Sequence, residues 1–320
     1  MLSKFLDPKN DVAFKKIFGT EKNQDILIHF LNDMLVFKEG KPITKVSFLK
    51  TVQDPEIAAK KTSIVDIMCA DEVGNQYIVE MQVAEGDGFI KRAQYYAAKA
   101  YSSQLKVAGK YHSLKEIIFL AITNFIMFPE KKEFKSDHVI LDKVTNEHDL
   151  KDFTFTFLEL SKFKKTKDEL TTIIDRWSYF FKHAEETSEK DLHQIIGQDL
   201  IIQRAYEELN KFSWSEEELL SYEAVIKREM DHQAILDKQY NQGKAEGKAE
   251  GKAEGKAEGK AEGKAEGKAE GKAEGKAEGK AEGKLEEAKS IAKAMLKKSL
   301  DLNLIAELTK LSIEEIKNIK

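Results

Sequence analysis

The 320-residue sequence lacks the features of several protein classes. Its single cysteine, Cys69, excludes an internal disulfide and fits a reducing cytoplasm. The longest apolar runs, such as residues 117–128, are too short or too interrupted to span a bilayer. Residues 1–8 lack the apolar core of a signal peptide. Cys69 and the seven scattered histidines form no zinc-ligand spacing. We therefore expect a cytoplasmic protein with no membrane span and no zinc module.

The chain also lacks a broad excess of positive charge. Its net charge is −4, and ten exact copies of Gly-Lys-Ala-Glu at residues 243–282 add nothing to it. The negative balance therefore lies in the body of the chain before the repeat. A basic surface is the usual electrostatic footprint of a nucleic-acid-binding protein. Any contact with DNA must come from a local patch.

The spacing of apolar residues divides the body into alternating helices and strands. Residues 10–35 predict a helix with Asn10 as its N-cap and a break near Gly19. Helical patterns return at residues 89–107 and over most of 167–238. The segments predicted as strands are residues 45–50, 63–70, 77–84, 115–125 and 153–160. This order predicts an α/β fold with a mixed sheet flanked by helices.

A loop near Asp54–Pro55 is expected to follow the first predicted strand. The next two strands, residues 63–70 and 77–84, form a predicted β-hairpin with Gly74 and Asn75 as turn residues. Alternation of side chains places Val65 on one face of the first hairpin strand and Asp66 on the other. The hairpin register is uncertain by about one residue.

Within that uncertainty, Asp66 lies opposite Glu80 or Gln82. Opposed side chains in a hairpin are about 4.5–5.5 Å apart at Cβ. Two acids that close repel each other unless a cation or a proton lies between them. A hard divalent cation such as Mg²⁺ suits an all-oxygen site and can activate a water molecule. The alternative is a solvated hairpin face, which the apolar neighbours Ile64, Met68 and Ile78 disfavour.

The pattern Asp66-x13-Glu80-x-Gln82 resembles the active-site hairpin of PD-(D/E)XK nucleases, in the Glu-x-Gln form of the Rpn-type transposase branch. Residues 9–19, 92–101 and 109–114 resemble the same branch, as does the C-terminal tail. The resemblance implies a restriction-endonuclease-like fold and a metal-dependent DNA endonuclease linked to recombination or mobile DNA.

The resemblance also assigns roles to the three hairpin residues. Asp66 and Glu80 would bind Mg²⁺ or Mn²⁺, and Gln82 would position the water or the metal. In the wider superfamily a lysine stands where this chain has Gln82. An amide can orient water but carries no positive charge. A catalytically inactive DNA-binding or self-associating protein on the same fold is therefore the alternative function.

Five further residues are candidates for the site. Asp11 matches the place of an additional acid in the superfamily, or is a first-turn acid favoured by the helix dipole. Arg92, Tyr95, Tyr96 and Lys99 lie within about two turns of one predicted helix. They could hold a DNA backbone and stack on a base. Alternatively, the tyrosines pack on the sheet and the basic side chains extend past them to solvent.

The repeat predicts a solvated spacer. Each four-residue period advances about 400° around a helix, so no fixed apolar face forms. Like charges meet at i,i+4, and each glycine costs about 1 kcal/mol in a helix. We expect a nuclease-like domain over residues 1–240, a spacer over 241–284 and a helical, helix–turn–helix-like tail over 285–320. The tail, with its Ser312 capping box, is a candidate surface for self-association.

Overall fold

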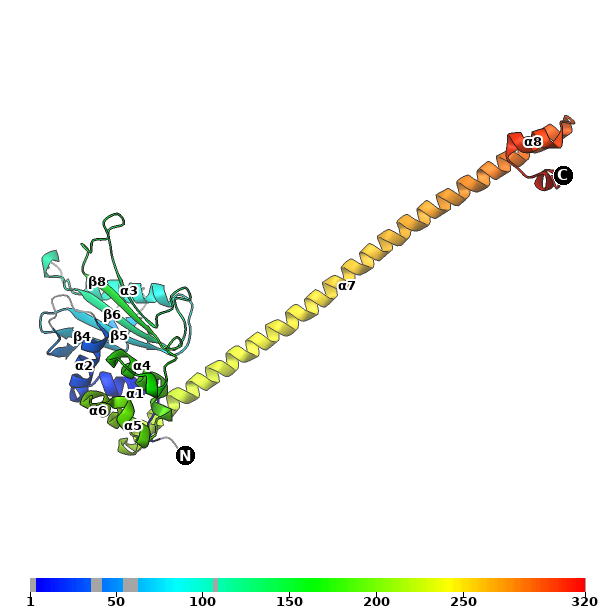
Figure 1. Ribbon diagram of the computed structural model, residues 1–320. Helices are drawn as coiled ribbons and strands as arrows, with labels where there is room; N and C mark the ends of the chain where they lie inside the picture. Colours follow the sequence, from blue (N-terminus) through cyan, green and yellow to red (C-terminus); the bar gives the residue numbers. More distant parts are fainter. Residues whose placement is uncertain (1–3, 36–41, 54–62, 106–108, 320) are drawn as a thin grey trace. The chain divides into compact units, whose positions relative to one another are not determined.

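The computed structural model describes residues 4–35, 42–53, 63–105 and 109–319 (Figure 1). The chain divides into two compact units, Met1–His232 and Gln233–Lys320. The loop expected at Asp54–Pro55 lies outside the described residues. The expected division into domain, spacer and tail stays a prediction.

The first unit is built on a six-stranded mixed sheet. In spatial order its strands are β1 (Val46–Phe48), β4 (Ile67–Asp71), β5 (Gln76–Gln82), β6 (Ile117–Thr123), β8 (Phe153–Glu159) and β7 (Lys135–Val139). The three central strands β5, β6 and β8 are parallel, and β1, β4 and β7 are antiparallel to their neighbours. The fully buried β6 forms the centre, as its uninterrupted apolar run predicts. Strands β2 (Val52–Gln53) and β3 (Ser63–Ile64) form a separate short ladder.

Helices cover both faces of this sheet (Figure 1). One face packs against α1 (Asp11–Phe18), α2 (Gln24–Met34), α4 (Ile173–His183), α5 (Glu189–Ile196) and α6 (Leu200–Glu208). The other face packs against α3 (Phe89–Ser103). The expected mixed sheet flanked by helices is therefore confirmed.

Helix α1 shows how local sequence fixes the first layer. The Asn10 side chain accepts a hydrogen bond from the Val12 N–H at 3.0 Å and caps the helix, as expected. The fully buried residues of α1 are Ala13, Phe14, Ile17 and Phe18. The helix ends at Gly19, where a Cβ would lie 2.8 Å from the Lys15 carbonyl oxygen and 3.5 Å from Ile67 Cγ1. A Cβ at Gly19 would therefore clash with the last turn of α1 itself, whereas Ile67 of β4 lies at an ordinary contact distance.

The hairpin register is one of the two expected from the sequence. Ile67 pairs with Val79 and Met68 with Ile78, which continues to Asp66 opposite Glu80. Gly74 adopts φ +92 in the turn, a conformation that favours glycine. The turn is held by Asp71, whose carboxylate accepts backbone N–H groups of Val73 and Asn75.

The first hairpin strand differs from the expectation in being broken. Residues 63–70 were expected to form one strand, whereas the chain bends at Asp66 between β3 and β4. Val65 consequently packs on the α3 side of the sheet, opposite to the face predicted by alternation. Ile64 is 61% exposed and gives the acids no apolar shielding. The bend arises because Asp66 forms hydrogen bonds to β5 through its side chain as well as its backbone.

The Gly-Lys-Ala-Glu repeat is helical in the full chain, whereas its sequence predicts a solvated spacer when it is considered in isolation. Helix α7 (Glu216–Lys297) has 82 residues and contains all ten copies. All repeat residues are exposed, and no described atom outside the local helix lies within 4 Å of a Cβ built on its glycines. Residues on both sides of the repeat are helical too, so the cost of nucleating the helix is met outside the repeat. Alanine, lysine and glutamate then favour propagation.

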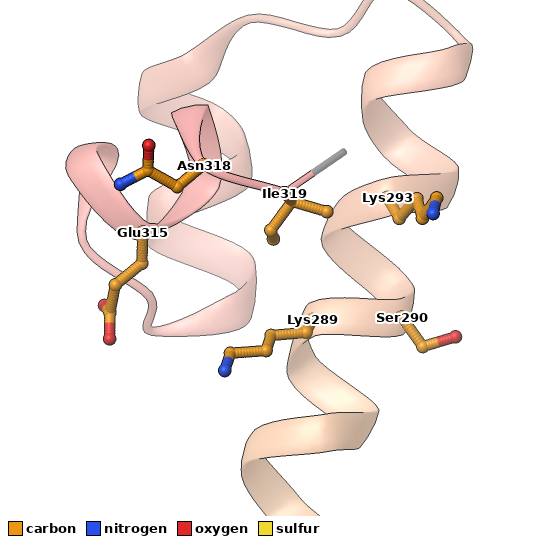
Figure 2. A pocket seen from close by; sticks show the side chains of 6 residues that line it. All are labelled: Lys289, Ser290, Lys293, Glu315, Asn318 and Ile319. Carbon is orange, nitrogen blue, oxygen red and sulfur yellow. The ribbon is translucent and has the colours of Figure 1, made fainter.

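The C-terminal tail folds around a small core. Helices α8 (Leu302–Thr309) and α9 (Ile313–Lys317) begin at the expected N-caps Asp301 and Ser312, and the Ser312–Glu315 capping box is present. The buried apolar residues of this core are Ala292, Ile305, Leu311 and Ile316. A polar groove of about 490 Å³ separates the end of α7 from α9 (Figure 2). Across the described ranges, no helix has the length and hydropathy that crossing a membrane requires.

Candidate active site

Two acidic side chains meet where β4 begins and β5 ends. The Asp66 N–H donates to Glu80 Oε1 at 3.2 Å, and Asp66 Oδ2 accepts the Met81 N–H at 2.9 Å. Glu80 is 3% exposed, although acids are rarely buried to this degree. The hairpin thus brings the two predicted acids together in a site closed to most solvent.

Burial dominates the electrostatics of this pair. Burial first, and the neighbouring charge of Asp66 second, together raise the pKa of Glu80 to about 8. Burial also raises the pKa of Asp66, while the hydrogen bond from the Met81 N–H acts in the opposite direction. Without a bound cation, the pair therefore retains a proton near neutral pH.

Gln82 lies at the end of β5 beside Glu80, and its orientation is fixed. Its amide nitrogen donates to Glu80 Oε2 at 3.3 Å and to the Met81 carbonyl at 3.1 Å. Its carbonyl oxygen accepts a hydrogen bond from the Arg92 guanidinium. The carbonyl expected to orient water is therefore already bound, and Gln82 presents a donor to the acid pair.

Arg92 extends from the first turns of α3 toward the hairpin. Its guanidinium lies 4.9 Å from the centre of the Phe89 ring, which holds the planar group in place. The buried Nε of Arg92 has no hydrogen-bond partner among the described residues. A buried donor of this kind is costly unless a ligand completes it, and an anionic oxygen is the natural acceptor.

The remaining candidates on α3 separate into two groups. Tyr96 is partly buried and packs with the apolar cluster under α3, whereas Tyr95 is 46% exposed. Their ring centres are 6.2 Å apart. Lys99 lies one turn farther along and is partly buried. Arg92 therefore binds the hairpin residue Gln82, and the exposed Tyr95 is placed to stack on a base.

Lys15 joins the site without having been foreseen from the sequence. Its ammonium lies 2.7 Å from Asp11 Oδ1 and 3.9 Å from Asp66 Oδ1. Asp11 thus contacts the acid pair through Lys15. Lys15 lies within the family-like segment 9–19, but the sequence assigns it no role because the contact depends on how α1 is seated on β4.

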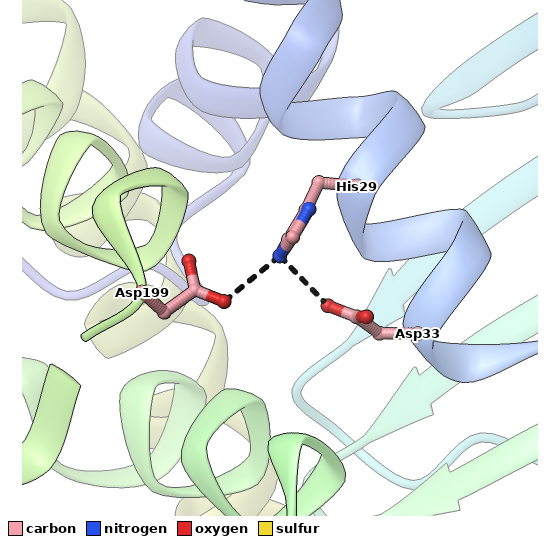
Figure 3. Close-up of side chains that lie close together, drawn as sticks. All are labelled: His29, Asp33 and Asp199. Atoms are coloured by element: carbon pink, nitrogen blue, oxygen red, sulfur yellow. Dashed lines mark hydrogen bonds and ion pairs between the residues drawn. The ribbon is translucent and has the colours of Figure 1, made fainter. Parts of the chain in front are cut away.

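A second group of metal-type ligands lies on the helical side of the first unit (Figure 3). His29 Nε2 is 3.3 Å from Asp33 Oδ2 and 2.9 Å from Asp199 Oδ2. The Trp177 indole N–H donates to Asp33 at 2.7 Å. Since the imidazole already bridges the two carboxylates, we interpret this group as a link between α2 and the start of α6.

The hairpin acids suit a hard divalent cation by their donor chemistry. They offer carboxylate oxygens, which Mg²⁺ and Mn²⁺ prefer. Their burial leaves negative charge with little compensation, as the raised pKa of Glu80 shows. A cation between Asp66 and Glu80 would remove this penalty, so the residues present fit the metal that the resemblance implies.

Comparison with known protein families places the chain. Residues 8–239 match the model of the PD-(D/E)XK nuclease family transposases. The protein belongs to this family. Residues 285–320 match the C-terminal helix–turn–helix domain of the Rpn/YhgA-like nuclease family. No curated protein and no solved structure shows significant similarity to the chain.

Membership of the PD-(D/E)XK family explains the architecture around the acids. The six-stranded mixed sheet flanked by helices is a restriction-endonuclease-like α/β fold. The family supports a nuclease- or transposase-like role, and PD-(D/E)XK nucleases typically use divalent metals. A helix–turn–helix tail is a DNA-binding motif, so both matches point to DNA as the partner.

Proposed function

We propose that this protein is a metal-dependent DNA endonuclease that hydrolyses phosphodiester bonds, in a process of recombination or mobile DNA. The observation that supports this most is the buried Glu80 facing the partly buried Asp66 in a PD-(D/E)XK family chain. A carboxylate pair that repels itself when empty is suited to bind a cation.

In this proposal, Asp66 and Glu80 hold Mg²⁺ or Mn²⁺. When bound, the cation would lower the pKa of a water molecule and neutralise charge on the phosphodiester. Gln82 donates to Glu80 and keeps that carboxylate oriented. Arg92 holds Gln82, and its positive charge acts on Glu80 beside the place where a phosphate would lie. Burial of the pair restricts bulk water and strengthens these interactions.

DNA binding in this proposal rests on a local surface, since the body of the chain is acidic. Arg92 and Lys99 would contact the backbone, and the exposed Tyr95 would stack on a base beside the partly buried Tyr96. The helix–turn–helix tail would add a second contact with DNA.

The test is cleavage of supercoiled plasmid by the purified full chain with Mg²⁺, with Mn²⁺ or with EDTA. We expect nicked or linear product with either cation and none with EDTA. Asp66→Ala and Glu80→Ala should each abolish cleavage without unfolding the protein. If either variant cleaves like the parent while EDTA still inhibits it, the assignment of the acids is wrong.

One observation favours a second function. Gln82 carries no charge, and its carbonyl is bound to Arg92, so the position lacks the cation that a lysine would supply. A catalytically inactive DNA-binding or self-associating protein would bind plasmid in a shift assay and leave it intact with every cation.

A further inference from the structure

The acid pair lacks a lysine at position 82, yet a lysine reaches it from another element. Lys15 lies on α1, and its ammonium is 3.9 Å from Asp66 Oδ1. The other oxygen of that carboxylate accepts the Met81 N–H. The lysine therefore faces the Asp66 oxygen that the hairpin backbone leaves available.

The packing of helix α1 and an ion pair with Asp11 both hold Lys15 in this position. One face of the helix is fully buried in the core, and its end is seated against β4 at Gly19. Asp11, one turn earlier, binds the ammonium at 2.7 Å. This second carboxylate would keep the ammonium near the site if a cation displaced it from Asp66.

The next residue on the same helix provides a comparison. Lys16 pairs with Glu218, and its ammonium lies 4.4 Å from the centre of the Trp214 ring. The two adjacent lysines thus make different contacts. One reaches the acid pair, and the other attaches the start of α7 to α1.

We infer that Lys15 is the cationic catalytic residue of this site, supplying from α1 the charge that Gln82 does not supply. The inference rests on the proposed nuclease function. In the free protein the ammonium compensates Asp66. With a divalent cation on the acids, it is repelled from Asp66 and binds a non-bridging oxygen of the scissile phosphate.

The reaction remains ordinary hydrolysis. The water oxygen forms a bond to phosphorus, the P–O bond to the leaving strand end breaks, and the released oxygen takes up a proton while the water loses one to solvent. Lys15 takes no part in these proton transfers, because its part is to bind negative charge as that charge develops on the phosphate.

The experiment measures two quantities that this role moves in opposite directions. For Lys15→Ala, cleavage of plasmid with Mn²⁺ should fall about 100-fold, the usual effect of removing one transition-state donor. Affinity for Mn²⁺ without DNA, measured by titration calorimetry, should rise about three-fold or more, because a positive charge near Asp66 is gone. Lys15→Arg should recover part of the cleavage, since it restores the charge.

Lys16→Ala is the matched control, with one lysine removed from the same helix. Both its cleavage and its Mn²⁺ affinity should stay within two-fold of the parent. Lys15→Met keeps the apolar stem and replaces Lys15→Ala if that variant does not melt cooperatively. An active parent with an equally active Lys15 variant overturns this inference alone. Cleavage and Mn²⁺ affinity that fall together show a structural role and also overturn it. An inactive parent overturns the proposed function itself, and the inference with it.

Discussion

At the scale of single residues, burial outweighs hydrogen bonding in the acid pair. Glu80 accepts donors from Asp66 and Gln82, yet its pKa rises to about 8 because the carboxylate is almost wholly withdrawn from water. The folded protein thus binds a proton that the unfolded chain releases above about pH 4.5. The site is organised for a positive charge that the protein supplies only in part.

This proton predicts how stability depends on pH. Without a divalent cation, the contribution of Glu80 is fully present below about pH 4.5 and is lost as pH rises through about 8. The free energy of unfolding should fall by up to about 1 kcal/mol per pH unit within that window. Denaturant melts of the parent and Glu80→Gln at several pH values measure it, and the variant should lack this component. If the free energies of unfolding of the parent and Glu80→Gln depend on pH in the same way, the raised pKa of Glu80 is contradicted.

The Arg92–Gln82 contact leads to a second residue-level prediction. Arg92→Lys keeps a charge but loses the planar fork that holds the Gln82 carbonyl and presents Nε. Plasmid cleavage should fall at least about ten-fold, the loss expected for one charge-assisted hydrogen bond. Lys91→Arg is the control, because Lys91 is exposed on the neighbouring position of α3 and should tolerate the change. Equal cleavage by Arg92→Lys and the parent would show that the planar guanidinium of Arg92 is not required for cleavage.

The sequence could predict that Asp66 faces Glu80, because hairpin pairing is local and regular. It could not predict Lys15, since that contact joins residues far apart in the chain through the packing of α1 on β4. It also misplaced Val65, because alternation assumes an unbroken strand and the hydrogen bonds of Asp66 bend it.

At the scale of elements, the end of α1 controls the distance between the helix and the hairpin. The central strands and most helices follow from apolar spacing, whereas β7 was missed because Lys135–Val139 is a polar edge strand. Its alternation shows little hydrophobic contrast, so pairing with β8 decides its structure. The end of α1 at Gly19, by contrast, was expected from the sequence, and only its contact with Ile67 of β4 depends on tertiary packing.

Gly19→Ala tests that packing. Its Cβ would lie 2.8 Å from the Lys15 carbonyl oxygen and would distort the last turn of α1, which carries Lys15. We expect a loss of about 1–3 kcal/mol in stability, as for other overpacking changes, together with slower plasmid cleavage. Gly86→Ala is the matched control, because no described atom lies within 4 Å of its Cβ. Equal melting temperatures for the two variants would show that the last turn of α1 accommodates the added methyl group without loss of stability.

At the scale of the whole molecule, the boundary between the two compact units falls within the sequence of α7. The apolar cores lie in the first unit and in the tail, and the repeat contributes to neither. Deleting residues 243–320 should therefore leave a first unit that folds alone. Its thermal transition should stay cooperative and within a few degrees of the parent. Loss of cooperative melting would contradict this boundary.

The helical structure of the repeat should depend on the helical segments on either side of it. A peptide of residues 243–284 should show little helicity by circular dichroism, because its glycines and its like-charge i,i+4 pairs disfavour an isolated helix. With the tail attached, helicity should increase with concentration if the tail associates. A strongly helical signal from the bare peptide, independent of concentration, would contradict both points.

The period of the repeat also has a genetic consequence. Four residues correspond to twelve nucleotides, so gaining or losing one copy leaves the reading frame of the tail intact. Each copy adds about 6 Å to a helix. Because every repeat residue is exposed, such a change removes no packing contact. A gain or loss of copies would therefore change the length of the helix without disturbing the apolar core of either unit.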